Sequence, residues 1–108
     1  MNWSVETLSK TVDEELNSLP VDMRARFVRT CELIAAVGLE RMGIPHIRHL
    51  TGPLWEMRLN GKDGTSRALY VVVKNKRIVV VRIFIKKTQK TPRQEINLAL
   101  QRAKEILP

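Results

Sequence analysis

The stretch KKTQKTP, residues 86–92, gathers three lysines and two threonines between a long apolar run and a helix-like segment. Cationic side chains at this density bind phosphate oxygens, and the N-terminus of a helix that follows them adds backbone N–H donors. The plain alternative is a loop that only solubilises the chain. We interpret the stretch as the rim of a phosphate-binding site, because the strand before it contributes further basic residues.

Charge is unevenly distributed along the 108 residues, whose formal net charge is +8. Residues 1–22 carry one lysine and five acids, whereas residues 23–108 carry 18 basic and 6 acidic side chains. A surface this basic attracts polyanions such as nucleic acids over long distances. A protein that is merely cationic is the alternative reading.

Composition limits the class of protein. The length predicts a single domain spanning residues 1–108, and 44% hydrophobic residues suffice for a globular core. The sequence contains no apolar run of the roughly 20 residues that a membrane helix needs. The first residues, MNWSVETLSK, do not resemble a signal peptide, and the single cysteine, Cys31, forms no internal disulfide and is interpreted as a core residue. These features favour a cytoplasmic protein without membrane contact.

The first half of the chain has helical periodicity after a short strand at NWSV, residues 2–5. Pro20 separates two apolar stripes, and Gly43 with Pro45 ends the second, which predicts a helical hairpin. The first stripe consists of Leu8, Val12, Leu16 and Leu19. The second consists of Phe27, Cys31, Ile34, Ala35 and Met42.

The second half predicts three antiparallel strands and a last helix. LWEMRL (54–59), RALYVVV (67–73) and RIVVVRIFI (77–85) are separated by the turn sequences NGKDG and KNK. Thr91, Pro92 and Gln94 match the cap, the first helical position and the capping box of a final helix. The predicted fold class is α+β, with a short N-terminal strand, a helical hairpin, a three-stranded antiparallel meander and a C-terminal helix.

The turns set a strand register in which Leu59 pairs with Ser66 and Lys74 pairs with Arg77. Since side chains alternate between the faces of a sheet, each face receives a defined set. One face carries Glu56, Arg58, Arg67, Leu69, Arg82, Phe84 and Lys86. The other, a core face, carries Trp55, Met57, Leu59, Ala68, Tyr70, Val79, Val81, Ile83 and Ile85.

The first of these faces is unusual because Arg58 would lie opposite Arg67, and like charges at this spacing repel each other. Glu56 is the one acid that balances the basic residues there. A polyanionic ligand explains the arrangement, and Lys86, Lys87, Thr88 and Lys90 would extend it into the loop. The alternative is that Glu56 pairs with one arginine while the others reach solvent.

Several motifs resemble the RelE/HigB superfamily of bacterial toxins, in particular its phage-derived HigB-like branch. They are LWEMRL, SRALYVVV and RIFIKKTQKTPRQEI, of which the Lys-Lys-Thr-x-Lys-Thr-Pro-x-x-Glu-Ile pattern (86–96) is the most specific. PHIRHL (45–50) also looks typical of the branch, and the resemblance covers residues 16–105.

The resemblance implies a RelE-like fold and a ribosome-dependent endoribonuclease, an mRNA interferase that needs no metal or other cofactor. The RNA 2′-OH would attack its adjacent phosphate while fixed cations stabilise the developing charge. The implied partners are mRNA on the ribosome and a helix-turn-helix, HigA-like antitoxin. The residues expected to be catalytic are Arg58, Arg67, Lys86 and Lys87. Those expected to contact RNA are Arg82, Phe84, Thr88, Lys90 and Glu56.

The sequence departs from many superfamily members because its C-terminal helix contains no tyrosine or histidine that could act as an acid or base. His46 and His49 precede the predicted sheet and are assigned to a connecting loop. Two other functions stay open: a ParE-like toxin that inhibits DNA gyrase, and a non-enzymatic nucleic-acid-binding module. The second lacks exposed aromatic residues for base stacking. The basic region shows no cluster of Asp, Glu and His for a metal.

Overall fold

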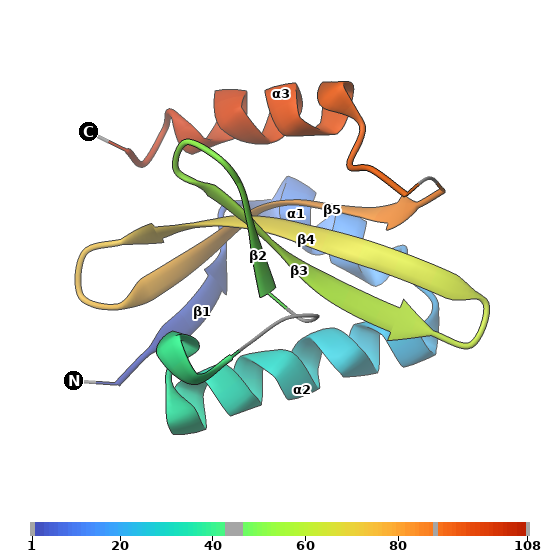
Figure 1. The fold of residues 1–108 in the computed structure, drawn as a ribbon, viewed down its shortest axis with the longest axis horizontal. Helices are drawn as coiled ribbons and strands as arrows, with labels where there is room; N and C mark the ends of the chain where they lie inside the picture. The colour runs from blue at the N-terminus through green and yellow to red at the C-terminus, as the bar shows by residue number, and fades with distance from the viewer. Residues whose placement is uncertain (1, 43–46, 88, 108) are drawn as a thin grey trace.

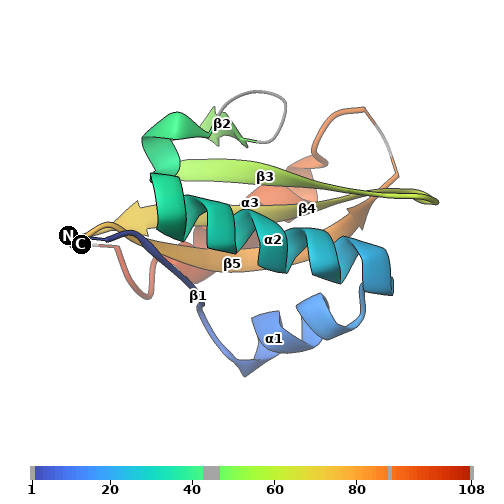
Figure 2. The same ribbon diagram turned by 90° about the horizontal axis from the view of Figure 1, so that it is seen from below.

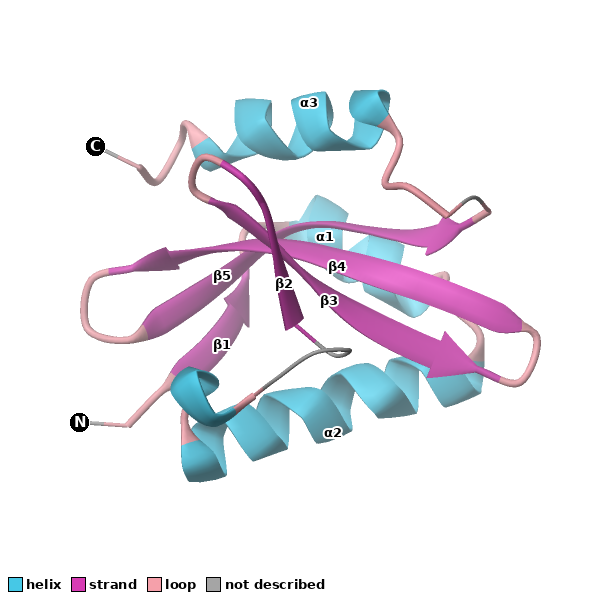
Figure 3. Cartoon of the chain, in the orientation of Figure 1, coloured by secondary structure: helices cyan, strands magenta, loops and turns pink. Residues whose placement is uncertain are grey.

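The computed structural model describes residues 2–42, 47–87 and 89–107, which form a twisted five-stranded sheet with helices on both faces (Figure 1). Figure 3 shows how the strands cross the centre of the molecule between α2 and α3. The predicted α+β class is therefore confirmed. No helix within the described ranges is long and apolar enough to cross a membrane.

The N-terminal part contains strand β1 (Ser4–Thr7), helix α1 (Lys10–Asn17) and helix α2 (Val21–Val37). The side chain of Ser9 caps α1 by accepting a hydrogen bond from the backbone N–H of Val12. The second helix ends earlier than the apolar pattern predicts. Gly38, with φ of 88°, terminates α2, and the 3-10 helix η1 (Leu39–Arg41) follows. Gly43 and Pro45, the predicted end, lie outside the described residues.

The sheet has the strand order β1-β5-β4-β3-β2, in which β1 pairs in parallel with β5 and the other neighbours are antiparallel. Its antiparallel strands are β2 (Ile47–Thr51), β3 (Leu54–Gly61), β4 (Gly64–Val73) and β5 (Arg77–Lys86). The short edge strand β2 is an addition to the predicted three-stranded meander. It contains His49, which the sequence assigned to a loop.

The predicted register is confirmed between β3 and β4, where Arg58 pairs with Arg67 and Leu59 pairs with Ser66. Between β4 and β5 the predicted register holds only from Thr65, which pairs with Lys86, to Leu69, which pairs with Arg82. A bulge after Leu69 shifts the pairing, so that Val73 rather than Lys74 pairs with Arg77. The predicted position of Val79 and Val81 on the face of Tyr70 is therefore wrong, because both pack in the cluster on the opposite face.

Two cores lie on the two faces of the sheet. Helices α1 and α2 cover one face (Figure 2), where Val12, Phe27 and Ile34 pack against a cluster that includes Tyr70 and Ile83. Ile85, predicted for this core, is instead 45% exposed. Helix α3 (Arg93–Ala103) packs on the other face through Ala99 and Ala103, over residues such as Leu69, Val81 and Phe84. Where β4 begins and β5 ends, this second face becomes basic.

Candidate functional site

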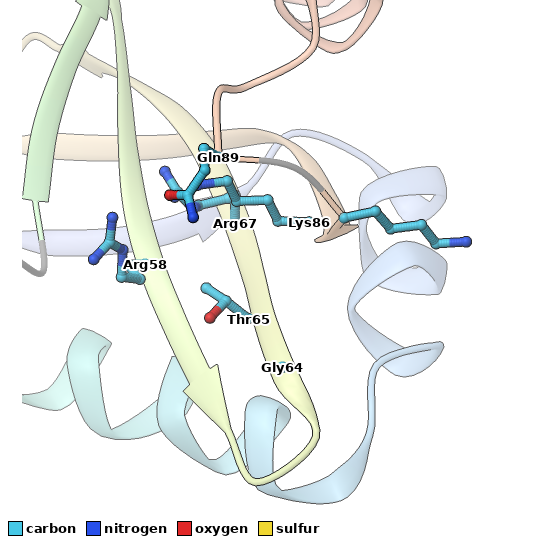
Figure 4. Close-up of a pocket in the computed structure, with 7 residues that line it drawn as sticks. Arg58, Gly64, Thr65, Arg67, Lys86 and Gln89 are labelled. Carbon is cyan, nitrogen blue, oxygen red and sulfur yellow. The ribbon is translucent and has the colours of Figure 1, made fainter.

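A cavity of about 530 Å³ opens where the β3–β4 hairpin meets the end of β5 (Figure 4). Its lining residues are Arg58, Gly64, Thr65, Arg67, Lys86, Lys87 and Gln89. The residues expected to be catalytic are thus brought together around one hollow. Gln89 was not singled out in the sequence, although it lies inside the KKTQKTP stretch.

Strand pairing positions the basic side chains. Arg58 lies opposite Arg67 across β3 and β4, and Thr65 lies opposite Lys86 across β4 and β5. Opposed residues of an antiparallel pair project from the same face, so Arg58, Arg67 and Lys86 are directed to one side of the sheet. The predicted basic face is therefore formed at these positions.

The hairpin that carries Arg58 and Arg67 is anchored to the N-terminus of α2. The carboxylate of Asp22 accepts a 2.7 Å hydrogen bond from the backbone N–H of Lys62 in the turn. Gly61 permits this close approach, because a Cβ atom there would lie 2.8 Å from Oδ2 of Asp22 and from Cγ of Met23. The helix on the core face thereby fixes the position of a turn beside the cavity.

A buried carboxylate lies next to the cavity. The side chains of Glu56 and Arg67 are only 3% and 1% exposed, and Nη1 of Arg67 donates to Oε1 of Glu56. The same oxygen lies 2.9 Å from Nη2 of Arg48, and Oε2 accepts a 2.6 Å hydrogen bond from Thr91. Glu56 is therefore engaged in holding side chains in place, whereas an RNA contact was predicted for it.

The predicted capping box is wrong, because Thr91 contacts Glu56. Helix α3 begins at Arg93 after an N-cap at Pro92, and no side chain hydrogen-bonds to that cap. The Thr-x-x-Gln pattern matched by spacing alone, but the threonine hydroxyl bonds to a carboxylate of the sheet instead of to the helix N-terminus.

Positive charge is concentrated around this carboxylate. Burial lowers the pKa of Arg67, and the neighbouring charges of Arg58 and Arg48 act in the same direction, while Glu56 opposes them. Burial also lowers the pKa of Lys86, together with the positive charges of Arg67 and Arg58. Lys86 therefore loses its proton more readily than an ordinary lysine, which is a property required of a proton-transfer group.

Arg82 differs most from its predicted state as a cation open to a ligand. Its guanidinium pairs with Glu95 of α3 at 2.7 Å and with Glu15 of α1 at 2.8 Å, and Glu15 also binds Arg102. Neither acid was placed near the sheet by the strand register, so the balancing charges were missed. Arg82 joins α1, β5 and α3 and does not line the 530 Å³ cavity.

The remaining predicted contacts lie in different surroundings. Phe84 is buried in the core under α3, and the guanidinium carbon of Arg82 lies 5.8 Å from its ring centroid. Lys87 and Lys90 are exposed in the segment after β5, and Lys87 lines the cavity. Thr88 lies outside the described residues, so its predicted RNA contact stays a prediction.

His49 and Cys31, which could in principle act as an acid–base group and a nucleophile, do not line the cavity. His49 of β2 places Nε2 2.8 Å from the carbonyl oxygen of Gly52, and its ring centroid is 4.9 Å from that of Trp55, which pairs with it across the strands. His46 is outside the described residues. Burial raises the pKa of the Cys31 thiol to about 12, and Cys31 packs against the core, as the sequence predicted.

Arg48 is a basic residue of this face that was not identified from the sequence. It pairs with Glu56 across β2 and β3, and its side chain is 50% exposed. The signal was weak, because β2 is only five residues long and most of its side chains are exposed, so no clear alternation marks it as a strand.

Comparison with known proteins agrees with the sequence motifs. Residues 14–104 match the family described as phage derived protein Gp49-like. A double mutant of the E. coli toxin RelE in the free state superimposes with a TM-score of 0.64 at 15% identity, covering 99% of this chain and 100% of that one.

A second solved structure, the archaeal RelE–RelB complex from Pyrococcus horikoshii OT3, has a TM-score of 0.55 at 26% identity. That match covers 79% of this chain and 96% of the archaeal one. A search among curated protein sequences gives no match. The predicted resemblance to the RelE/HigB superfamily is confirmed: the chain belongs to the phage-derived Gp49-like family and has the fold of RelE.

Proposed function

We propose that this protein is the toxin of a toxin–antitoxin system and that it cleaves mRNA on the ribosome. The observation that carries the proposal is the convergence of Arg58, Arg67, Lys86 and Lys87 on one cavity in a chain with the RelE fold. Such a concentration of cations is costly for the folded protein alone and suits a phosphodiester whose negative charge increases in the transition state.

In the proposed reaction the 2′-oxygen of a ribose attacks the adjacent phosphorus atom. The bond from phosphorus to the 5′-oxygen of the next nucleotide breaks, leaving a 2′,3′-cyclic phosphate and a 5′-hydroxyl end. The 2′-OH releases one proton to solvent water, and the departing 5′-oxygen takes one up. Arg58 stabilises the negative charge on the non-bridging oxygens, as fixed donors do in other sites of this kind.

We assign the proton donated to the 5′-oxygen to Lys86. Its lowered pKa makes proton release easier, and it lines the same cavity as Arg58, from β5 instead of β3. Arg67, which is almost wholly buried, acts as a fixed positive charge beneath the phosphate. Lys87 binds the neighbouring RNA backbone from the exposed rim.

The proposed partner is a helix-turn-helix antitoxin of the HigA type that covers the cavity, and the proposed location is the cytoplasm, where ribosomes are available. Support for an antitoxin comes from the archaeal relative, which was solved as a complex of RelE with RelB. The helix-turn-helix class rests on the resemblance to the HigB-like branch.

A cleavage assay on translating ribosomes tests the proposal. Purified protein is added to a translation reaction, and mRNA ends are mapped by primer extension, with a parallel assay of DNA gyrase supercoiling. We expect cuts with 5′-hydroxyl ends from the wild-type protein. Arg58→Ala and Lys86→Ala should each reduce the rate by about 10²-fold or more.

Lys74→Ala is the matched control, because it removes one exposed lysine from the β4–β5 turn, away from the cavity. It should cleave like the wild type. If the folded wild-type protein inhibits gyrase and leaves ribosome-bound mRNA intact, the endoribonuclease proposal is wrong and the ParE-like alternative is supported.

A further inference from the structure

The edge strand β2 adds a cation to the basic face that the cavity itself does not include. Arg48 pairs with Glu56 across β2 and β3, so both side chains project from the face that carries Arg58 and Arg67. We propose that Arg48 binds a backbone phosphate next to the one in the cavity, so that RNA runs across the sheet towards β2. This inference rests on the proposed function and extends its binding surface.

Burial separates the two arginines that share Glu56. Both guanidiniums contact Oε1, but the side chain of Arg67 is 1% exposed and that of Arg48 is 50% exposed. Arg67 is therefore committed to the interior, whereas Arg48 can leave the carboxylate and reach a ligand in solvent. Because Oε2 is occupied by Thr91, Glu56 keeps hydrogen bonds on both oxygens when Arg48 moves away.

Strand geometry places Arg48 within reach of the cavity. Arg58 follows Glu56 by two positions on β3, which makes Arg48 and Arg58 diagonal neighbours on one face. Such neighbours lie about 7–8 Å apart, a distance that long side chains span easily. Arg48 is also close enough for its positive charge to contribute to the lowered pKa of both Arg67 and Lys86.

Stability alone accounts poorly for this residue. The guanidinium of Arg48 is half-exposed and therefore screened by solvent, and the buried Glu56 keeps Arg67 and Thr91 as partners without it. Arg48 also adds a positive charge that is repelled by Arg58, Arg67 and Lys86 on the same face. A surface that binds successive phosphates explains why a further cation is placed there.

The test measures binding separately from cleavage. The probe is a fluorescein-labelled single-stranded RNA oligonucleotide with a 2′-O-methyl group on every nucleotide, which cannot be cut by the proposed route. Its dissociation constant is determined over a series of salt concentrations for wild type, Arg48→Ala and Arg48→Lys. Thermal unfolding is measured for the same samples.

The structure offers a matched control in Arg29. It is also a surface arginine in an ion pair, 3.9 Å from Glu32 and 67% exposed, but it lies on α2, across the sheet from the cavity. Arg29→Ala removes the same net charge as Arg48→Ala. Any effect of total charge on binding therefore appears equally in both variants.

We expect Arg48→Ala to weaken RNA binding and to reduce the slope of log K against log salt by about 0.7, the value for one phosphate contact on a single strand. Arg48→Lys should restore the slope, Arg29→Ala should keep it, and unfolding temperatures should stay within a few degrees. If Arg48→Ala matches Arg29→Ala in binding, or loses stability with unchanged affinity per folded molecule, the inference is overturned.

Arg58→Ala separates this inference from the function on which it rests. If Arg58→Ala weakens RNA binding while Arg48→Ala has no effect, only the role of Arg48 is wrong. If the wild-type protein and both variants bind equally weakly, with no dependence on salt, the role of Arg48 is overturned, whereas the proposed function is overturned only by intact mRNA in the ribosome assay.

Discussion

The hydroxyl group of Thr91 donates a 2.6 Å hydrogen bond to Oε2 of Glu56, a carboxylate buried in the middle of β3. The other oxygen of Glu56 binds Arg67 of β4 and Arg48 of β2. One side chain therefore joins two neighbouring strands and the segment that leads into α3. We infer that Glu56 sets the position of the lysine-rich segment relative to the basic face.

Replacing Thr91 by valine, which has the same shape but no hydroxyl, should lower the free energy of unfolding by about 1–3 kcal/mol, as expected for a hydrogen bond to a charged group. Thr91→Ser should retain most of the stability. Thr91→Asn supplies a good N-cap side chain and should not restore it, because Thr91 does not cap α3. Urea unfolding of the three variants decides between the roles, and full stability in Thr91→Asn would support capping.

Sequence patterns were sufficient where a turn fixes the register. The Asn-Gly and Asp-Gly pairs define a short hairpin, so the opposition of Arg58 and Arg67 follows directly. The β4–β5 pair could not be resolved in the same way. Both faces are apolar over residues 78–81, and a shift of one residue leaves the hydrophobic pattern unchanged, so the bulge that redirects Val79 and Val81 has no signal.

Contacts between distant elements were beyond the sequence. The pairing of strands says nothing about which helix side chains reach the sheet, so Glu15 and Glu95 could not be assigned to Arg82. Arg48 was missed because a five-residue edge strand with mostly exposed side chains resembles a loop. Thr91 matched a capping motif, and only the position of Glu56 reveals its true partner.

Arg67→Ala should reduce stability as well as cleavage, because it leaves the buried carboxylate of Glu56 with a weaker, half-exposed partner. Breaking a buried ion pair typically costs about 3–5 kcal/mol. The double variant Glu56→Gln/Arg67→Ala, in which no buried charge is left unpaired, should recover part of this loss. Chemical unfolding of the single and double variants measures the coupling, and strictly additive effects would contradict a direct pair.

Glu15 should make stability depend on pH on the acid side. Burial raises the pKa of Glu15, but hydrogen bonds from Arg102, Ile83 and Arg82 outweigh it and lower the pKa below the ordinary value of 4.5. Its stabilising contribution is therefore fully present above pH 4.5 and is lost as the pH falls through the lowered value. Glu15→Gln should be less stable than wild type at pH 7, and the difference should shrink at lower pH.

Urea unfolding of wild type and Glu15→Gln between pH 7 and pH 3 measures this difference. Glu32→Gln is the matched control, since it removes one carboxylate whose side chain is 64% exposed, and it should change stability little. A difference between wild type and Glu15→Gln that stays constant over this range would mean that the charge of Glu15 is not what stabilises the network.

Lys86 should respond to the removal of a neighbouring charge. Burial and the positive charges of Arg67 and Arg58 lower its pKa from the ordinary 10.5, so Arg58→Gln, which removes one of these charges, should raise it. At pH values between the lowered pKa and 10.5, the unfolded chain binds more protons than the folded one. The free energy of unfolding therefore rises with pH over this range. In Arg58→Gln the pH range between the pKa of Lys86 and 10.5 becomes narrower.

The chemical shift of the Lys86 Cε carbon, followed by NMR over a pH titration, reports the change. The pKa of Lys86 also bears on the proposed chemistry, because only a protonated Lys86 can donate to the 5′-oxygen. The cleavage rate should therefore fall as pH rises through this pKa. The alkaline limb of the residual activity of Arg58→Gln should then move to higher pH, whereas Arg29→Gln should leave both the titration and the limb in place. A wild-type Lys86 that titrates at 10.5 or above would remove the basis for assigning it the proton transfer.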